Sequence, residues 1–392
     1  MIKAAKEKLI EPLTKLFNRI LTIKEIPDAW TCSEIVLLYK KGNPKLISNY
    51  RPISLISCLY KLFASTLLRR ITTRIDENQP VEQAGFMKNF STNDHIHTQK
   101  IIIERYMEYD LPLYVAFIDY SKAFDSISHD SIWRALYQQG LDHDYVEIVR
   151  AIYLKSTTRV RLDSRGPTFR VERGVKQGDP LSPKLFIAVL ECIFRNLDWR
   201  DIGINVNGKY LSHLRFADDI VLLSENPHTL NHMIESLNRH SETVGLQINW
   251  DKTKIMTNRD EIPISIRSKP IEYVADYIYL GHLIAMKSRT EKEVDSRVKN
   301  TWNKYWAMKE IYKSPIPTRL KTKAMNICLT SVLTYACQTW SLEKSVLNKI
   351  RICQRGIERS YMNIKLKDRV ISSLIRKRTK ARDAVKQILT EC

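Results

Sequence analysis

Two short apolar segments place acidic residues at strand ends, and they constrain the fold more than any other feature. Residues 113–118 (LYVAFI) stop at Asp119, as in a buried strand whose carboxyl end presents a carboxylate. Residues 214–223 (LRFADDIVLL) read as two short strands around Asp218 and Asp219, which predicts a tight hairpin. Buried like-charged carboxylates are costly unless a metal or another cation neutralises them. Taken alone, each acidic group also fits a solvated turn or a cap.

The pattern of predicted elements changes near residue 286, which predicts an α+β fold followed by helices alone. Upstream, helical spacing and strand patterns alternate. The predicted helices there are 3–22, 55–75, 184–198 and 229–244. The other strand patterns are 34–39 and the hairpin 276–284, and residues 245–257 lead into a further strand. Downstream, only helices are predicted, over 291–312, 316–338 and 342–361.

Charge shifts at the same boundary. The chain has 63 Lys and Arg against 43 Asp and Glu, a formal net charge of +20. Residues 286–392 hold 25 of those cations and 9 of the acids, so they carry +16 while the rest carries +4. A nearly balanced body with a basic C-terminal third favours a catalytic module joined to a nucleic-acid clamp. A merely soluble basic protein is the alternative.

Cysteine usage and hydropathy bear on the compartment. The seven cysteines are scattered and no two form a C-x2-C pair, which predicts reduced thiols. No apolar run approaches the roughly 20 residues that cross a bilayer, so no membrane partner is expected. The N-terminal residues are amphipathic and broken by charges, unlike a secretory signal. We therefore expect an intracellular protein of the nucleus and/or cytoplasm that is not secreted.

An ordered series of motifs resembles the reverse transcriptase domain of non-LTR (LINE-type) retrotransposons, over roughly residues 10–345. The resemblance implies a right-hand polymerase, with fingers, a palm whose antiparallel sheet is backed by helices, and a helical thumb, followed by a basic helical tail. The motifs are IVLLYKKGNPKLISNYRPISLIS at 35–57, QAGFMKNFSTNDHI at 83–96, FIDYSKAFDSISH at 117–129, GVKQGDPLSPKLF at 174–186, FADDIVLL at 216–223, GLQINWDKTKIM at 245–256 and YLGHLI at 279–284.

The resemblance also implies a division of the chain. Because the fingers pattern begins close to Met1, we expect no endonuclease domain ahead of it. The expected parts are an N-terminal extension and fingers at 1–112, a fingers–palm domain spanning 19–285 overall, a thumb at 286–345 and a basic segment at 346–392.

The implied activity is RNA-directed DNA polymerisation, a nucleotidyl transfer. The enzyme would extend a DNA primer or target DNA with dNTPs on an RNA template, using two Mg²⁺ ions for which Mn²⁺ can substitute. Such chemistry needs carboxylates on rigid elements as metal ligands. The resemblance assigns that role to Asp119, Asp218 and Asp219, with the carbonyl of Tyr120 beside them. It makes Lys252 the proton donor to pyrophosphate, for which a solvated lysine is the alternative.

Further residues are implied to contact the substrate. Phe124 matches an aromatic residue under the sugar, where a ring would exclude a 2′-hydroxyl; a core aromatic is the alternative. Gln177 and Gly178 match the loop that contacts the template and incoming base, or form a simple turn. Arg51 matches a fingers arginine near the triphosphate, since a guanidinium suits phosphate oxygens, or makes a surface ion pair. Lys40 and Lys41 are weaker candidates for the same role.

The basic C-terminal third leaves several interpretations open. In helix 291–312, the cations Lys292, Arg297, Lys299 and Lys304 are better candidates for phosphate contact than the aromatic residues, which suit a core. The cluster RKRTKAR at 376–382 fits RNA binding, a nuclear address or a solvated helix face. For the whole chain, a non-catalytic binder of RNA or RNA–DNA hybrid and a group II intron-type maturase are the competing hypotheses.

Overall fold

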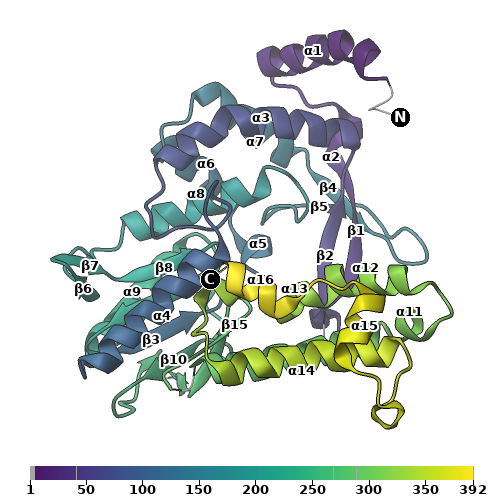
Figure 1. The fold of residues 1–392 in the computed structure, drawn as a ribbon. Helices are drawn as coiled ribbons and strands as arrows, with labels where there is room; N and C mark the ends of the chain where they lie inside the picture. The colour runs from purple at the N-terminus through teal and green to yellow at the C-terminus, as the bar shows by residue number, and fades with distance from the viewer. Residues whose placement is uncertain (1–4, 41, 268, 288, 392) are drawn as a thin grey trace. The chain divides into compact units, whose positions relative to one another are not determined.

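The computed structural model, drawn as a ribbon in Figure 1, describes residues 5–40, 42–267, 269–287 and 289–391. The chain divides into two compact units. The first unit comprises Met1–Phe90, Val115–Thr253 and Ile262–Ile271. The second unit comprises Ser91–Tyr114, Lys254–Glu261 and Glu272–Cys392.

A sheet in the first unit contains the two predicted acidic segments. Strand β3 (Tyr114–Ile118) is buried along its whole length and lies next to β9 (Asp219–Ser224), which in turn pairs with β8 (His213–Phe216). Strands β8 and β9 are antiparallel, with Phe216 opposite Asp219. The buried strand and the tight hairpin predicted from the sequence are both confirmed.

Helices supply the core around these strands. Helix α8 (Ser182–Arg195) is buried on nearly all sides and packs against α6 (His129–Gln138), as expected of an apolar helix in a core. Helix α9 (Pro227–Thr243) packs on β9, and the Asn226 side chain caps its first turn by accepting from the backbone N–H groups of His228 and Thr229. These helices fix the position of the hairpin.

A second sheet in the first unit has the order β2-β1-β4-β5. Strands β1 and β2 are antiparallel, with Leu38 opposite Arg51, whereas β1 and β4 are parallel. The bounds are Cys32–Tyr39 for β1, Tyr50–Leu55 for β2, Thr157–Val160 for β4 and Phe169–Arg170 for β5. The remaining elements of this unit are α1 (Lys6–Ile23), α2 (Asp28–Thr31), η1 (Ile47–Asn49), α3 (Cys58–Glu77), α5 (Ala123–Ser126), α7 (His143–Leu154), β6 (Ile204–Val206), β7 (Lys209–Leu211), β11 (Ser265–Ile266) and β12 (Lys269–Pro270).

The second unit begins with mixed elements and ends with helices. Its strands form a parallel pair, β10 with β13, and an antiparallel hairpin, β14 with β15. Beyond β15 the described residues contain no strand, which confirms the predicted change of pattern. The predicted helix 316–338 is too long, because α12 ends at Cys328. The bounds are α4 (Thr92–Glu108), β10 (Lys254–Thr257), β13 (Glu272–Tyr273), β14 (Asp276–Tyr279), β15 (His282–Ala285), α10 (Arg289–Ala307), α11 (Lys309–Lys313), α12 (Thr318–Cys328), α13 (Thr330–Leu333), η2 (Cys337–Thr339), α14 (Lys344–Tyr361), η3 (Leu366–Asp368), α15 (Ser372–Thr379) and α16 (Ala384–Glu391).

Helix α10 shows which of its predicted roles the structure supports. Val294 and Tyr305 are fully buried in the core of the second unit, as expected of apolar residues at helical spacing. Arg297 is also buried: it pairs with Glu293 and its guanidinium lies 4.6 Å from the centre of the Tyr335 ring. The interpretation of Arg297 as a phosphate contact is therefore wrong, because a neighbouring carboxylate already neutralises it.

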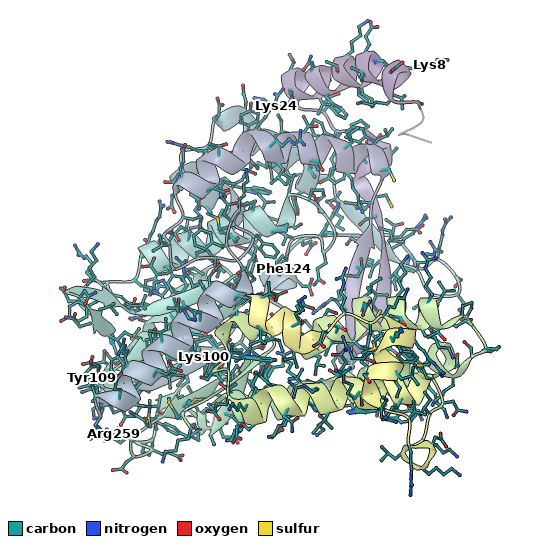
Figure 2. The ribbon with its side chains drawn as sticks, viewed as in Figure 1. Lys8, Lys24, Lys100, Tyr109, Phe124 and Arg259 are labelled. Atoms are coloured by element: carbon teal, nitrogen blue, oxygen red, sulfur yellow. The ribbon has the colours of Figure 1, made fainter. Side chains whose placement is uncertain are left out.

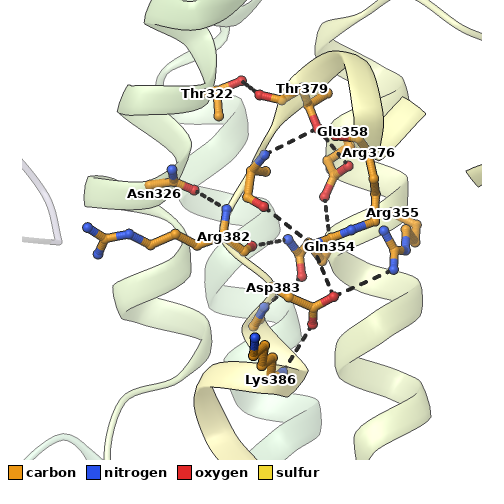
Figure 3. Close-up of polar contacts among 12 residues, drawn as sticks. Thr322, Asn326, Gln354, Arg355, Glu358, Arg376, Thr379, Arg382, Asp383 and Lys386 are labelled. Atoms are coloured by element: carbon orange, nitrogen blue, oxygen red, sulfur yellow. Dashed lines mark hydrogen bonds and ion pairs between the residues drawn. The ribbon is translucent and has the colours of Figure 1, made fainter. Parts of the chain in front are cut away.

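The basic cluster 376–382 is folded onto α14 through a polar network (Figure 3). The Glu358 carboxylate is fully buried and accepts from Arg376 at 3.4 Å and from the Thr379 hydroxyl at 3.2 Å. Arg376 also pairs with Asp383 at 3.0 Å, and the Gln354 side chain accepts from the backbone N–H of Ala384. One of the cluster's cations, Arg376 of α15, thus joins α14 to the residue that precedes α16.

This network predicts a stability effect. Replacing Arg376 with Met would leave Glu358 buried without its cation, which should lower the free energy of unfolding by about 3 kcal/mol. Urea denaturation followed by circular dichroism measures the change. The matched control is Lys377→Met on the exposed neighbouring residue, which should change stability by less than about 0.5 kcal/mol. An equal loss in both variants would contradict the structural role of Arg376.

Candidate functional site

The β8–β9 hairpin presents the paired acids on a constrained turn. Ala217 and Asp218 form the turn, and Asp219 is the first residue of β9. Ala217 has a φ of 57°, a left-handed conformation that is uncommon for residues other than glycine. Because β9 is otherwise buried, this short turn brings both carboxylates to the edge of the sheet.

Asp119 directly follows β3 and is held by the segment before β10. Its carbonyl accepts from the Asn249 N–H at 2.7 Å, and the Ser121 N–H donates to the Gln247 carbonyl at 2.8 Å. These bonds flank a bridge between Tyr120 and Ile248, so the backbone carbonyl of Tyr120 points away from this segment. The Tyr120 side chain is buried.

Lys252 lies against the predicted acidic site. Its Nζ donates to Asp119 Oδ2 at 3.1 Å, with the Asp119 side chain 28% exposed. An ammonium group thus occupies one face of this carboxylate. The structure brings the predicted proton donor and the predicted metal ligand together.

The pKa values of Asp218 and Asp219 show that both carboxyl groups lie within electrostatic reach of Asp119. Burial raises the pKa of Asp218, and the Asp119 carboxylate raises it further. Partial burial and the charges of Asp218 and Asp119 raise the pKa of Asp219 to about 6. Arg51 and Lys40 act in the opposite direction on Asp218, so both cations lie within electrostatic reach of it. Because three carboxylates close together repel one another, a positive charge placed among them is strongly stabilised.

The donor set suits a hard divalent cation. Carboxylate oxygens are the ligands that such ions prefer, and the Lys252 ammonium stands where positive charge is required. Among the described residues, no group of three or more His, Cys, Asp or Glu is arranged closely enough to be a preformed metal cluster. A bound ion would therefore compete with Lys252 for Asp119.

Phe124 lies half-buried in α5 (Figure 2). Its ring stacks on Phe186 of α8, with centroids 4.5 Å apart and planes inclined by 13°. Phe86 meets the same ring edge-on at 6.4 Å. The ring is thus held in one orientation by two others, which fits both the sugar-contacting role and the core role.

The loop with Gln177 and Gly178 is joined to β2. The Ser54 N–H donates to the Gln177 carbonyl at 2.8 Å, and the Gln177 amide donates to Asp125 at 3.4 Å. Gly178 has a φ of 107°, and a Cβ there would lie 3.1 Å from the Ser54 carbonyl oxygen. Glycine is therefore required for this close approach. Asp125 thus serves the loop as a hydrogen-bond acceptor.

Arg51 projects from the same strand β2. Its side chain is exposed, and the described residues include no carboxylate in an ion pair with it. The Lys40 side chain is also exposed. Its backbone N–H donates to the carbonyl of Asn49, the residue before β2. Both cations are thus available to a phosphate ligand. Lys41 lies outside the described residues.

Gln83 and Gly85 hold the acidic turn in place. In the sequence they were noted only as part of the motif at 83–96. The Gln83 side-chain carbonyl accepts from the N–H groups of Gly85 at 2.8 Å and Ala217 at 3.2 Å. The Ala84 N–H donates to the Arg215 carbonyl at 3.0 Å, so this segment lies along β8. A Cβ on Gly85 would come within 2.2 Å of the Ala217 nitrogen.

Arg215, immediately before the hairpin tip, is another support that sequence reasoning missed. It is 1% exposed, pairs with the buried Glu191 at 3.0 Å, and stacks its guanidinium 4.1 Å from the centre of the Phe194 ring. Glu191 also accepts from Arg195 at 2.9 Å. The only sequence signal was an arginine in an otherwise apolar strand, which is equally typical of an exposed position.

The match of residues 39–284 to the family "Reverse transcriptase (RNA-dependent DNA polymerase)" defines the class of this protein, and the chain belongs to that family. The predicted resemblance is confirmed. Similar proteins include the Pol polyprotein of the retrotransposable element R2DM of Drosophila melanogaster, 31% identical over 64% of this chain and 24% of that one. The RNA-directed DNA polymerase from the D. melanogaster mobile element jockey is 24% identical over 90% of this chain and 40% of that one.

The fold is similar to that of a solved telomerase. The structure of apo telomerase from Candida tropicalis, truncated from its C-terminal domain, superposes with a TM-score of 0.50 at 12% identity, covering 67% of this chain and 55% of that one. This likeness confirms the α+β polymerase-type fold. The chain spans only 24–40% of the length of the first curated relatives. None of the helices in the described ranges is long and apolar enough to span a bilayer.

The approach of Gly85 to the acidic turn predicts a sharp substitution effect. Gly85→Ala would force the turn away from its position, and we expect a loss of about 1–3 kcal/mol of stability from overpacking. Thermal unfolding measures it. Gly166→Ala is the matched control, because its nearest atom, the Val160 carbonyl oxygen, would lie 3.3 Å away and no positive φ is involved. If both variants melt at the wild-type temperature, the close packing of Gly85 against the Ala217 nitrogen does not contribute to stability.

Proposed function

We propose that this chain is an RNA-directed DNA polymerase that extends a primer 3′-hydroxyl with dNTPs on an RNA template. The single observation that carries the proposal is the convergence of Asp119, Asp218 and Asp219: the charge of Asp119 raises the pKa values of both other carboxyl groups. Membership of the reverse transcriptase family supports the reaction type. The relative named as an RNA-directed DNA polymerase supports the choice of template and product.

The three carboxylates would hold divalent ions, which we propose to be two Mg²⁺, with Mn²⁺ able to substitute. When bound, such ions activate the attacking hydroxyl and stabilise the leaving pyrophosphate. The Tyr120 carbonyl, which points away from the 247–249 segment, is available as a further ligand. The Lys252 ammonium, which donates to Asp119 at 3.1 Å, would supply a proton to the pyrophosphate oxygens.

The neighbouring residues would position the nucleotide. Arg51 and Lys40 lie within electrostatic reach of Asp218. Their positive charges would bind the triphosphate of the nucleotide. Phe124, held by Phe186, would place a rigid ring under the sugar and exclude a 2′-hydroxyl. The Gln177–Gly178 loop, fixed to β2, would contact the template and the incoming base. We further propose that the primer is DNA or target DNA and that the protein acts in the nucleus and/or cytoplasm.

Removal of one carboxylate tests the reaction. Asp218→Asn should reduce primer extension on RNA by about 100-fold or more, since even substitutions behind metal ligands cost 10- to 100-fold. Incorporation of labelled dNTPs with Mg²⁺ or Mn²⁺ measures this. Asp163→Asn, an exposed acid of the same unit, is the control and should retain full activity. Equal extension by both variants would reject the site, and RNA binding without extension by wild type would favour a non-catalytic binder.

Sugar selection tests Phe124. Phe124→Val removes the ring, so the ratio of dNTP to rNTP incorporation efficiency should fall by about 10- to 100-fold, a change of the size that pocket shape supplies. Single-nucleotide extension with each nucleotide measures kcat/KM. Phe169→Val, an exposed phenylalanine of β5, should leave the ratio unchanged. A lower activity with both nucleotides at an unchanged ratio would show that Phe124 serves only the core.

A further inference from the structure

A cleft on the second unit lies between α14, the loop that follows it and the start of α15. Its volume is about 680 Å³, and every lining residue belongs to one continuous stretch of chain. The lining residues are Arg351, Ile352, Arg355, Gly356, Arg359, Ser360, Ile364, Leu366 and Ser372. Basic and aliphatic side chains thus share one concave surface.

Three arginines follow one face of α14. Arg351, Arg355 and Arg359 recur every fourth residue, which places successive side chains about 6 Å apart along the helix axis. This spacing is comparable with that of successive phosphates along a nucleic-acid strand. Arginine is also the side chain best suited to phosphate oxygens, because its planar group donates two parallel hydrogen bonds.

These arginines are short of acidic partners. The two nearby acids, Glu358 and Asp383, are both engaged by Arg376, and Arg355 reaches Asp383 only at 3.8 Å. Within the described part of the chain, Nη1 of Arg355 is buried without an acceptor, and so is Nη1 of Arg359.

The surrounding charge adds to this imbalance. Burial and the charge of Arg376 lower the pKa of Arg355, against the opposing charges of Glu358 and Asp383. The loop contributes three further exposed cations, and Arg359 holds the loop by donating to the Val370 carbonyl at 2.6 Å. Those cations are Lys365, Lys367 and Arg369.

Aliphatic side chains stand beside the arginines. Ile352 is 63% exposed and Leu366 is 82% exposed, although both are large apolar residues. Such side chains next to cations suit a ligand that combines negative charge with apolar faces. Single-stranded RNA has both, because its phosphates can meet the arginines while its unstacked bases cover the aliphatic groups. A duplex keeps its bases stacked and could use only the charges.

We propose that the Arg351–Arg355–Arg359 cleft is a binding site for single-stranded RNA, separate from the acidic site of the first unit. RNA is preferred to an acidic peptide because the chain belongs to the reverse transcriptase family; in this choice of ligand the inference rests on the proposed function. The cleft holds the strand by its phosphates and gives no sequence readout, since guanidinium–phosphate contacts carry none.

The test uses the full chain and a fluorescein-labelled oligouridylate. Binding is followed by anisotropy across a salt series, for wild type and for Arg351→Gln/Arg355→Gln/Arg359→Gln. If the three arginines contact phosphates, the slope of log affinity against log salt should decrease by about 2. The matched control, Lys377→Gln/Arg378→Gln/Lys380→Gln, removes the same charge from the same segment outside the cleft and should leave the slope nearly unchanged. Equal changes in both variants would overturn the proposal.

Two further measurements keep the result interpretable. Crosslinking with 4-thiouridine should label peptides containing Ile352 or Leu366, and labelling elsewhere alone would overturn the proposal. Because the triple variant could unfold, the single variant Arg351→Glu at an exposed position should also reduce affinity while melting at the wild-type temperature. Displacement of the RNA by polyglutamate but not by unlabelled oligouridylate would identify an acidic peptide site instead.

The proposal and the proposed polymerase activity can fail separately. Asp218→Asn should remove most of the extension activity but changes no residue of the cleft, so it should bind oligouridylate with the wild-type salt slope. A wild-type protein that fails to extend primers yet shows the cleft-dependent slope would reject only the polymerase. A protein that extends primers while the cleft variant binds normally would reject only the cleft.

Discussion

Mutual repulsion among three carboxylates is the constraint on which the first unit depends. The charge of Asp119 raises the pKa values of Asp218 and Asp219, so holding the three carboxylates together costs free energy. The Lys252 ammonium offsets part of this cost at Asp119, and Arg51 does so at Asp218 from a distance. A divalent cation with a polyphosphate would satisfy all five groups at once. The same repulsion that costs stability therefore favours the binding of positive charge at this turn.

Such a site requires a scaffold that does not relax. Gln83 accepts from the N–H of Ala217, and Gly85 leaves no space for the turn to move. Below the turn, Arg215 and Glu191 form a buried ion pair that anchors β8 to α8. Buried pairs of this kind contribute little net stability, but breaking one is strongly destabilising. They fix one geometry, which is what closely spaced like charges need.

The sequence predicted the parts of this site that are local. An apolar run ending at Asp119 and a short run around Asp218 gave the strand and the hairpin, because strand periodicity and turn length are encoded in neighbouring residues. Contacts between distant segments were not predictable in this way: nothing near Arg215 in the chain reveals Glu191. Helix α4 escaped pattern analysis because polar residues such as Gln99 are buried on its inner face, which hides the helical stripe. The roles of Phe124 and Lys252 came from family resemblance, and the structure adds only their positions.

Net charge predicted a nucleic-acid partner but could not locate the surface that binds it. Arg215, Arg297 and Arg376 all add to the basic total, yet each is neutralised by a carboxylate of its own unit. The cations that remain for a polyanion are those whose acidic neighbours are already engaged, as Arg376 engages the acids beside Arg355. When one arginine forms an ion pair with the local carboxylates, the neighbouring arginine is left without an acidic partner and can bind a polyanion. This is why a cluster such as RKRTKAR, read as a single basic patch in the sequence, divides into a structural part and an exposed part once the helices are packed.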